Sequence, residues 1–248
     1  AEDGIRDRSP SRGLGDVYKR QRFDREHRAE RPIPRGVISA RTVWVLGVLQ
    51  LALGLGCVIW INLAAAVCAL GLTACVLWYN WQHKRINWSP LIMGLCRLLL
   101  YLLAVAVAVG SVAWPGIIAA LAHGGYVIGL SNIARKEATR GRVNSWPCWL
   151  LLLPLAIPFV LISIPTSPER EAWILLPPLI VFALWVGRSL LFTFKAAIPQ
   201  HGRTVSGLLA GIVLLDAVVA SVPNPGFGPV FIVLFLLALL FQRFIPAT

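Results

Sequence analysis

Long apolar runs alternate with short polar connectors along most of the chain. A transmembrane α-helix needs about 20 mostly apolar residues to cross the hydrocarbon core of a bilayer. Eight runs approach that length: Thr42–Trp60, Asn62–Trp81, Leu91–Val112, Gly116–Ala134, Trp146–Ile164, Ala172–Phe194, Val205–Val222 and Phe227–Phe241. The pattern predicts an all-α fold, a polytopic transmembrane helix bundle with eight spans in this sequence.

Positive charge falls on alternate connectors. Lys and Arg gather in Arg22–Arg41, Gln82–Pro90, Arg135–Asn144, Lys195–Arg203 and Gln242–Thr248, whereas the connectors between them carry only Arg170. Basic loops stay on the cytoplasmic side of a membrane. We therefore expect a multi-pass protein of a prokaryotic cytoplasmic (inner) membrane, with the basic loops and both ends of the fragment inside.

Composition agrees with a membrane location. The chain is 57% hydrophobic and 14% charged, with a net charge of +12 and a mean hydropathy of +0.73. A nucleic-acid-binding role is excluded, because the basic residues lie between apolar spans and not on one surface. The five cysteines lie in or beside apolar runs without a CxxC motif, which favours a packing role over a disulfide framework or a metal site.

The most informative polar segment is Arg22–Gly36, RFDREHRAERPIPRG, which leads directly into the first apolar run. If it is helical up to Pro32, Asp24, Arg28 and Arg31 lie on one face. A carboxylate takes a hard cation and guanidiniums take phosphate oxygens, so this face suits a metal-bridged diphosphate. The alternative is a basic juxtamembrane loop that only sets topology.

The pattern D-x6-RPIPRG in this segment resembles the end of the first signature of the UbiA superfamily of membrane prenyltransferases. That signature reads roughly NDxxDxxxD and then RPIPxG. Asp24 matches its last aspartate and Arg31–Gly36 matches its end. The preceding Asn and two Asp are absent, and Lys19 and Arg20 lie where acids are expected.

The residues upstream account for this departure. Ser11–Gln21, SRGLGDVYKRQ, matches the in-frame translation of a transposon-based sequencing adapter. We expect residues 1–21 to be an adapter-derived, non-native segment, which is excluded from fold reasoning. Residues 22–248 would then form a UbiA-like transmembrane prenyltransferase domain that is incomplete at its N-terminus.

A second polar stretch follows the second apolar run. Tyr79 followed by Lys84-Arg85 resembles the Tyr–x–Lys–Arg element of the family. A lysine at a helix end can reach a phosphate as a point charge. The alternative is that Lys84 and Arg85 are topology charges.

The third stretch, Ser131–Glu137, lies where the family carries its second aspartate-rich motif. Only Glu137 is acidic here, beside Arg135 and Lys136. The surrounding GYVxGLxxxARxE pattern and the upstream MGLCR resemble the EboC branch of the superfamily. A basic second site could bind diphosphate directly, or the metal-dependent reaction could have been lost.

Two charges lie inside apolar runs. Such charges cost about 2.5–3.5 kcal/mol on insertion scales, so they face the bundle interior or reach for an interface. Arg97 is a candidate diphosphate ligand. Asp216 is expected to pair with Arg97 or Arg188, or to line an acceptor pocket.

The resemblance implies a bundle that transfers a polyprenyl group from a polyprenyl diphosphate to a small, often aromatic acceptor with the help of Mg²⁺. No obligatory protein partner is indicated. The alternative is a non-catalytic UbiA-like protein that binds or transports a lipid or small metabolite. The implied roles are metal binding and catalysis for Asp24 and Glu137, diphosphate binding for Arg28, Arg31, Lys84, Arg97, Arg135 and Lys136, and an isoprenoid pocket for Tyr79 and Tyr126.

The number of spans departs from the family. Nine helices are usual, two of them before or within the first motif, which would leave seven. The additional run is expected to be Ala172–Phe194, which Pro177-Pro178 interrupts.

Overall fold

The computed structural model describes residues 32–33, 35–83, 86–139, 143, 145–158, 169–196, 199–221 and 225–244. All regular structure in these residues is helical, which confirms the predicted all-α class. The chain divides into two units, Ala1–Gly56 and Cys57–Thr248.

In the first unit, a turn within the RPIPRG motif leads into helix α2 (Ala40–Ile61). The Gly36 N–H donates to the Ile33 carbonyl at 3.0 Å, and the φ of Gly36 is +75°, a region that favours glycine. Ser39 precedes the helix, and its Oγ accepts a hydrogen bond from the Thr42 N–H at 3.0 Å, as an N-cap does. The motif glycine therefore has a structural role in turning the chain into α2.

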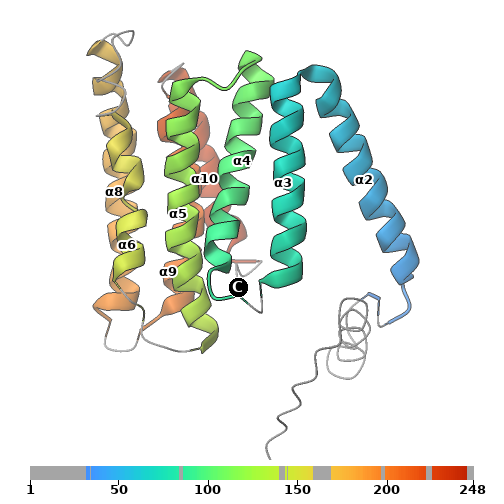
Figure 1. The fold of residues 1–248 in the computed structure, drawn as a ribbon. Coiled ribbons are helices and arrows are strands. Elements are labelled where there is room, and N and C mark those ends of the chain that lie inside the picture. Colours follow the sequence, from blue (N-terminus) through green and yellow to red (C-terminus); the bar gives the residue numbers. More distant parts are fainter. Residues whose placement is uncertain are drawn as a thin grey trace, which may run out of the picture. The chain divides into compact units, whose positions relative to one another are not determined.

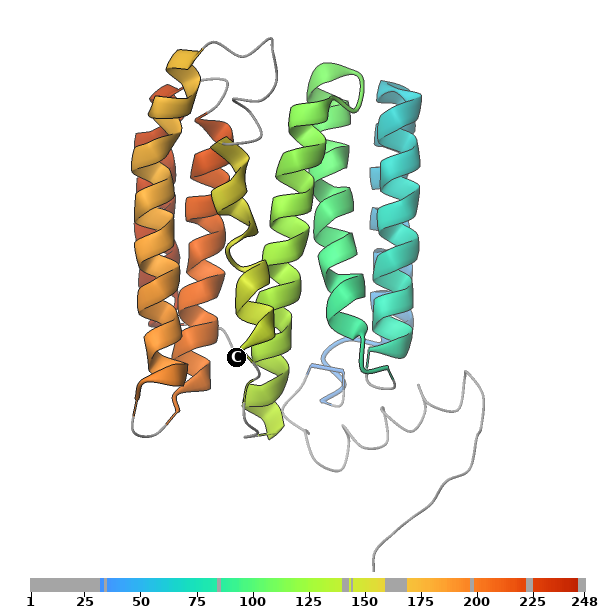
Figure 2. The ribbon, with the colours of Figure 1, turned by 60° about the vertical axis from the view of Figure 1, so that its left-hand side comes forward.

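The second unit contains a row of packed helices (Figures 1 and 2). Helix α3 (Leu63–Gln82) packs on α4 (Ser89–Val109), α4 on α5 (Trp114–Thr139), and α5 on α9 (His201–Ala220). Helix α9 also contacts α8 (Glu169–Phe194) and α10 (Gly228–Phe241), which the short 3-10 turn η2 (Pro225–Phe227) precedes. The short helix α6 (Trp146–Leu150) and the 3-10 turn η1 (Leu153–Ala156) lie against α5.

Six of the eight predicted spans are confirmed by length and composition. They are α2, α3, α4, residues Trp114–Lys136 of α5, residues Leu175–Phe194 of α8, and α9. Helix α8 continues through Pro177 and Pro178, so the expected interruption at these prolines is wrong. Helix α10 is apolar but has 14 residues, fewer than the roughly 20 that a full span needs.

The run Trp146–Ile164 does not form the continuous helix that was predicted. Its described part contains α6 and η1, with a turn at Leu151 and Leu152 between them. Pro154 lacks an N–H and its ring crowds the carbonyl four residues earlier, which favours a break in the α-helix here, although α8 tolerates two prolines. Apolar length alone did not predict this break.

Glycines bring the backbones of α4 and α5 close together. A Cβ added to Gly94 would meet the Ile128 side chain and lie 2.7 Å from the Gly124 carbonyl oxygen. A Cβ on Gly124 would lie 3.1 Å from the Gly94 carbonyl oxygen. Small residues allow such close approach between membrane helices, and this contact fixes the spacing of the two helices that hold most of the polar side chains described below.

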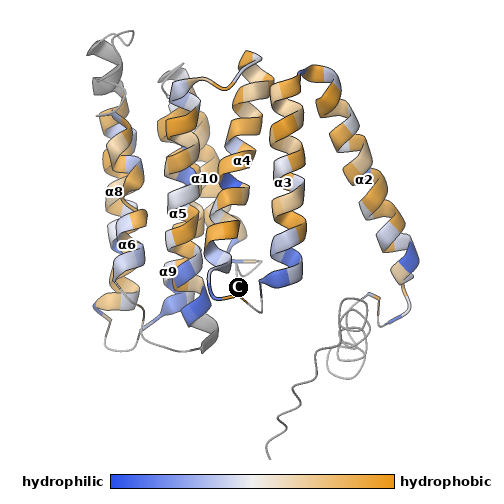
Figure 3. Ribbon diagram, viewed as in Figure 1, coloured by the Kyte–Doolittle hydropathy of each residue, from blue (hydrophilic) through white to orange (hydrophobic). Residues whose placement is uncertain are grey.

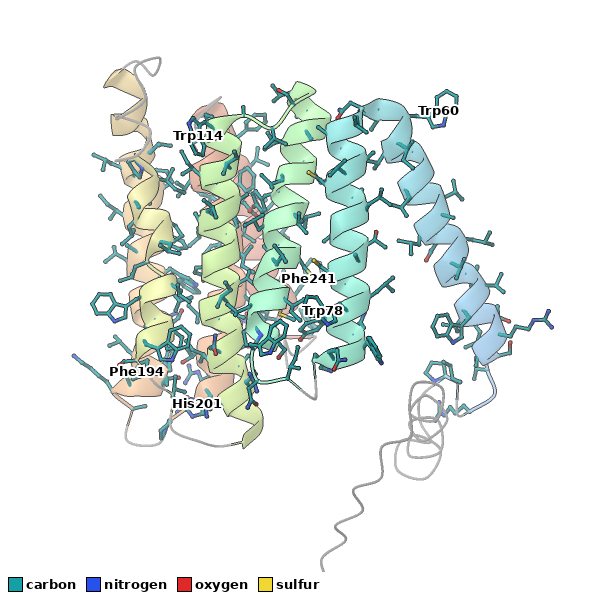
Figure 4. The ribbon with its side chains drawn as sticks, in the orientation of Figure 1. Trp60, Trp78, Trp114, Phe194, His201 and Phe241 are labelled. Atoms are coloured by element: carbon teal, nitrogen blue, oxygen red, sulfur yellow. The ribbon has the colours of Figure 1, made fainter. Side chains whose placement is uncertain are left out.

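Polarity follows the long axis of the second unit. Hydrophilic residues gather toward the ends of α3, α5 and α9 near the α3–α4 and α5–α6 connections, whereas the middle parts of the helices are mostly hydrophobic (Figure 3). Trp114 lies near one end of the bundle and His201 near the other (Figure 4). The ends of α3, α5 and α9 near these connections are called the basic end below.

Candidate functional site

A cavity of about 360 Å³ opens between α3, α4, α5 and α9. Most of its wall is apolar, and the polar atoms come from a few side chains. The wall includes Tyr79, Met93, Leu130, Ser131, Arg135 and Leu209. Its size and its mixture of an apolar wall with few polar groups are typical of a small-molecule site.

Among the described residues that line this cavity, Arg135 is the cation. Its Nη1 donates to the Asn87 carbonyl oxygen and its Nη2 to Asn87 Oδ1 at 3.3 Å. Asn87 belongs to the α3–α4 connection, so these bonds hold the guanidinium of α5 at the rim of the cavity. A guanidinium has five N–H groups, and those that Asn87 does not use can bind an anion.

The other polar residues of Ser131–Glu137 are engaged locally. Ser131 Oγ donates to Met93 Sδ at 3.0 Å, and Asn132 Nδ2 donates to the Ile128 carbonyl at 2.9 Å. Lys136 lies in the last turn of α5. Glu137 belongs to α5, but its side chain lies outside the described part of the structure.

A second polar group lies deeper in the bundle, where α4, α5 and α9 meet. It consists of Arg97, Tyr101, His123 and Asp216, here called the interior cluster. At 1.5 Å per residue, Arg97 lies about 12 Å into α4 and His123 about 14 Å into α5. The cluster is therefore within the lengths of these candidate spans and not at their ends.

His123 is fixed on three sides. Its Nδ1 is 2.8 Å from the Ala119 carbonyl oxygen and its Nε2 is 3.0 Å from Asp216 Oδ1. Its ring stacks on that of Tyr101 with centroids 3.6 Å apart. Since a carbonyl can only accept, Nδ1 carries a hydrogen, and the hydrogen bond between Nε2 and Oδ1 requires one proton on either atom.

Arg97 is less well satisfied. Its Nη2 is 3.9 Å from Asp216 Oδ2, which is too long for a hydrogen bond. Its Nε is buried and has no hydrogen-bond partner among the described residues. Its guanidinium lies 5.3 Å from the centre of the Tyr101 ring.

The cavity and the interior cluster share the same helix faces. On each helix the positions follow spacings of three or four residues, which place them along one stripe. The stripes are Pro90, Met93, Arg97 and Tyr101 on α4, His123, Val127, Leu130 and Ala134 on α5, and Val205, Leu209, Ile212 and Asp216 on α9. The cluster therefore continues the cavity-lining faces toward the interior.

The predicted site residues are distributed over these regions. Tyr79 lines the cavity, and its predicted contact with an isoprenoid stays a prediction. Asp216 pairs with Arg97, one of the expected partners, and not with Arg188. Arg97 thus lies in the interior cluster and not beside Arg135 at the rim. Its side chain is directed toward Asp216 on α9. Asp24, Arg28, Arg31 and Lys84 lie outside the described residues.

Tyr126 was expected in the isoprenoid pocket, but the structure places it elsewhere. It is fully buried in the core, its OH donates to the Leu208 carbonyl at 2.7 Å, and its ring lies 5.6 Å from that of Phe182. The hydroxyl is satisfied by helix α9, so Tyr126 joins α5, α8 and α9 and does not line the cavity.

Sequence reasoning missed His123, Tyr101 and Asn87. A signal existed for His123, because it is the one histidine in the apolar run Gly116–Ala134, and histidines within spans commonly mark functional sites. No local pattern connects it with Asp216, which is 93 positions away.

The described residues do not form a metal site. No three His, Cys, Asp or Glu side chains in this part of the chain lie close enough together to hold a metal ion. The described side chains at the cavity rim are basic or neutral, so they fit an anion and not a divalent cation.

An apolar cavity below a guanidinium, within a bundle of membrane-spanning helices, suits an amphiphilic anion with a long apolar tail. The model of the UbiA prenyltransferase family matches residues 18–245, and the chain belongs to that family. Searches of curated proteins and of solved structures found no match.

Proposed function

We propose that the chain is an integral membrane prenyltransferase that transfers a polyprenyl group from a polyprenyl diphosphate to a small acceptor. The observation that carries this proposal is the apolar cavity with Arg135 at its rim, in a chain of the UbiA prenyltransferase family. An amphiphilic substrate needs both features at one site.

The diphosphate is assigned to the rim. Arg135 offers the N–H groups that Asn87 leaves unused, and guanidiniums bind phosphate oxygens in pairs of hydrogen bonds. Lys136, Lys84, Arg28 and Arg31 are proposed to add positive charge. The isoprenoid tail lies along the apolar wall. The allylic C–O bond breaks with its electron pair on the diphosphate, and the Tyr79 ring face stabilises the carbocation. The acceptor then forms a bond to the allylic carbon and gives up a proton to the released diphosphate.

Magnesium remains part of the proposal through the family resemblance alone. Asp24 and Glu137 are the proposed ligands, and the described side chains at the rim contain no carboxylate that could join them. We therefore assign no step to the metal. Activity with excess Mg²⁺ and with EDTA decides whether the basic rim works without it.

The test is diphosphate release from a polyprenyl diphosphate with a panel of small acceptors. Arg135→Gln is expected to raise the KM for the polyprenyl diphosphate at least tenfold, because it removes a phosphate contact. Arg243→Gln is the matched control, since Arg243 is exposed after α10 and does not line the cavity. Absence of release with every acceptor from a chain that has native residues before Arg22, or equal effects of the two substitutions in that chain, would contradict the proposal.

A non-catalytic role is the second candidate, and one observation favours it. The second motif position, Ser131–Glu137, contains a single acid, Glu137, beside the basic Arg135 and Lys136. A protein that binds or transports a lipid would retain binding of polyprenyl diphosphate but form no product with any acceptor. Product formation would exclude this reading.

We also propose that residues 1–21 are foreign to the domain and that the domain belongs to the EboC-like branch. The family match begins at Tyr18, so it leaves out residues 1–17 but includes the last four residues of the proposed foreign segment. Deleting residues 1–21 should leave the melting temperature in detergent unchanged, whereas a large loss would contradict a foreign origin. The assay above should be run on the printed chain, which we expect to be inactive, and on a chain with native residues before Arg22.

The basic end is proposed to face the cytoplasm, following the distribution of Lys and Arg. In a cysteine-free variant, a single cysteine at Asn87 should react with an impermeant reagent only from the cytoplasmic side, and one at Ser111 only from the opposite side. Labelling of both from one side would contradict this topology.

A further inference from the structure

The interior cluster contains hydrogen-bonding groups that the described residues leave unused. Arg97 makes no hydrogen bond to any described residue, and its Nε is buried without a partner. Asp216 uses Oδ1 for His123, while Oδ2 only faces Arg97. An unsatisfied charged group in an apolar interior is costly, so this arrangement points to a missing third group.

The geometry restricts what that group can be. Arg97 Nη2 and Asp216 Oδ2 are 3.9 Å apart, and one oxygen at about 2.8 Å from each fits between them. That oxygen must accept from the guanidinium and donate to the carboxylate. A hydroxyl does both with one atom. A carboxylate or phosphate offers no donor to Asp216, and an ammonium offers no acceptor to Arg97.

The Arg97–Asp216 pair lies on the same helix faces that line the cavity. Arg97 follows Met93 by one helical turn on the cavity-lining face of α4, about 6 Å deeper. Both charged side chains are 27% exposed, so neither is sealed off.

We propose that Arg97 and Asp216 form a recognition site for the hydroxyl group of a small alcohol or phenol. If the chain has the proposed function, on which this assignment rests, the ligand is the acceptor of the polyprenyl group. The acceptor hydroxyl lies in the interior cluster and the diphosphate lies at the rim.

His123 is a positioning residue for this site. Its Nδ1 is anchored to Ala119 and its Nε2 to Asp216 Oδ1, so the imidazole orients the carboxylate with Oδ2 toward Arg97. It is 1% exposed and does not contact the ligand.

The first test uses the 248-residue chain in detergent and three probes that share a ring system. Fluorescence titration measures the affinity for 2-naphthol, 2-methoxynaphthalene and naphthalene-2-carboxylate. The methoxy oxygen can accept from Arg97 but cannot donate to Asp216. We expect 2-naphthol to bind at least tenfold more tightly than either analogue, because sites built around a hydroxyl reject ligands that lack it.

The second test asks whether Arg97 and Asp216 cause the preference for 2-naphthol over its two analogues. Arg97→Met and Asp216→Asn should each reduce the advantage of 2-naphthol to less than threefold. Arg188→Met is the matched control, an arginine in an apolar helix that contacts the Trp185 and Phe192 rings instead, and it should keep the full preference. Melting temperatures identify the variants that fold, and either folded variant suffices.

Several results would overturn the proposal. Equal binding of 2-naphthol and 2-methoxynaphthalene by the unmodified chain would mean that water alone fills the gap. Tightest binding of the carboxylate would mean that Arg97 serves an anion. A folded Arg97→Met protein that still prefers 2-naphthol would mean that other residues recognise the hydroxyl group. No polyprenyl diphosphate is present, so failure of this proposal and failure of the transfer reaction are observed separately.

Discussion

The cavity rim and the interior cluster lie on the same faces of α4 and α5, but they differ in whether their positive charge is paired with a negative one. At the rim, the exposed Arg135 is held by the neutral Asn87 and retains its positive charge. In the interior, Arg97 faces Asp216, which a histidine also holds. Because the cost of an unbalanced charge rises with depth in a membrane, the rim can present a net cation to an anion, while the interior can present only a balanced pair to a neutral polar group.

The difference predicts that substitutions in the interior cluster affect stability most. Asp216→Asn removes the carboxylate that faces Arg97 and leaves that guanidinium without a counter-charge. Breaking a fully buried ion pair costs about 3–5 kcal/mol, and partial exposure of this pair reduces our expectation to about 2–3 kcal/mol. The measurement is the free energy of unfolding in mixed micelles. A loss below 0.5 kcal/mol would mean that the pair is not stabilising.

Gly94→Ala tests the helix contact that sets the spacing of both regions. Its methyl group would lie too close to Ile128 and to the Gly124 carbonyl, so α4 and α5 must separate. Overpacking of this kind costs about 1–3 kcal/mol. Gly187→Ala is the control, since nothing lies within 4 Å of its added Cβ, and it should be neutral or slightly stabilising. Equal melting temperatures for the two variants would contradict close packing here.

Tyr126→Phe should have a smaller effect. It keeps the ring in the core but removes the hydrogen bond to the Leu208 carbonyl, at a cost of about 1 kcal/mol. Since Tyr126 does not line the cavity, affinity for a polyprenyl diphosphate should stay within twofold. A large loss of affinity at unchanged stability would return Tyr126 to the isoprenoid pocket.

Arg135→Gln should have the smallest effect on stability, below about 0.5 kcal/mol, as is usual for exposed positions. Because Arg135 is exposed, water can replace its hydrogen bonds to Asn87. Thermal unfolding in detergent checks this expectation. A loss as large as that of Asp216→Asn would remove the contrast between rim and interior.

The sequence predicts the helices of this molecule better than the contacts of individual side chains. Lipid contact demands continuous apolar length, so α3, α4 and α5 could be predicted from the runs alone. Pro154 ended a run that hydropathy treated as continuous. The resemblance around Ser131–Glu137 drew attention to Arg135, which the structure places at the cavity, and its role in binding diphosphate stays a prediction. The sequence limited the expected charged partners of Asp216 to two arginines, Arg97 and Arg188, but it did not predict the hydrogen bond to His123.

The remaining failures share a cause. Whether a residue on a span faces lipid, the core or a cavity depends on which helices pack beside it. Tyr126 was expected at the cavity, yet its neighbours come from α8 and α9, more than 50 positions away. Sequence periodicity predicts which residues share a face of a helix, but the tertiary structure is needed to know what that face contacts.

The central claim is that the rim binds the diphosphate and the interior cluster does not. The most direct measurement is the affinity of the chain for a non-cleavable polyprenyl thiodiphosphate, compared among the unmodified protein, Arg135→Gln and folded Asp216→Asn. The account predicts at least a tenfold loss for Arg135→Gln and a change within twofold for Asp216→Asn. A tenfold loss for Asp216→Asn together with unchanged binding by Arg135→Gln would contradict it.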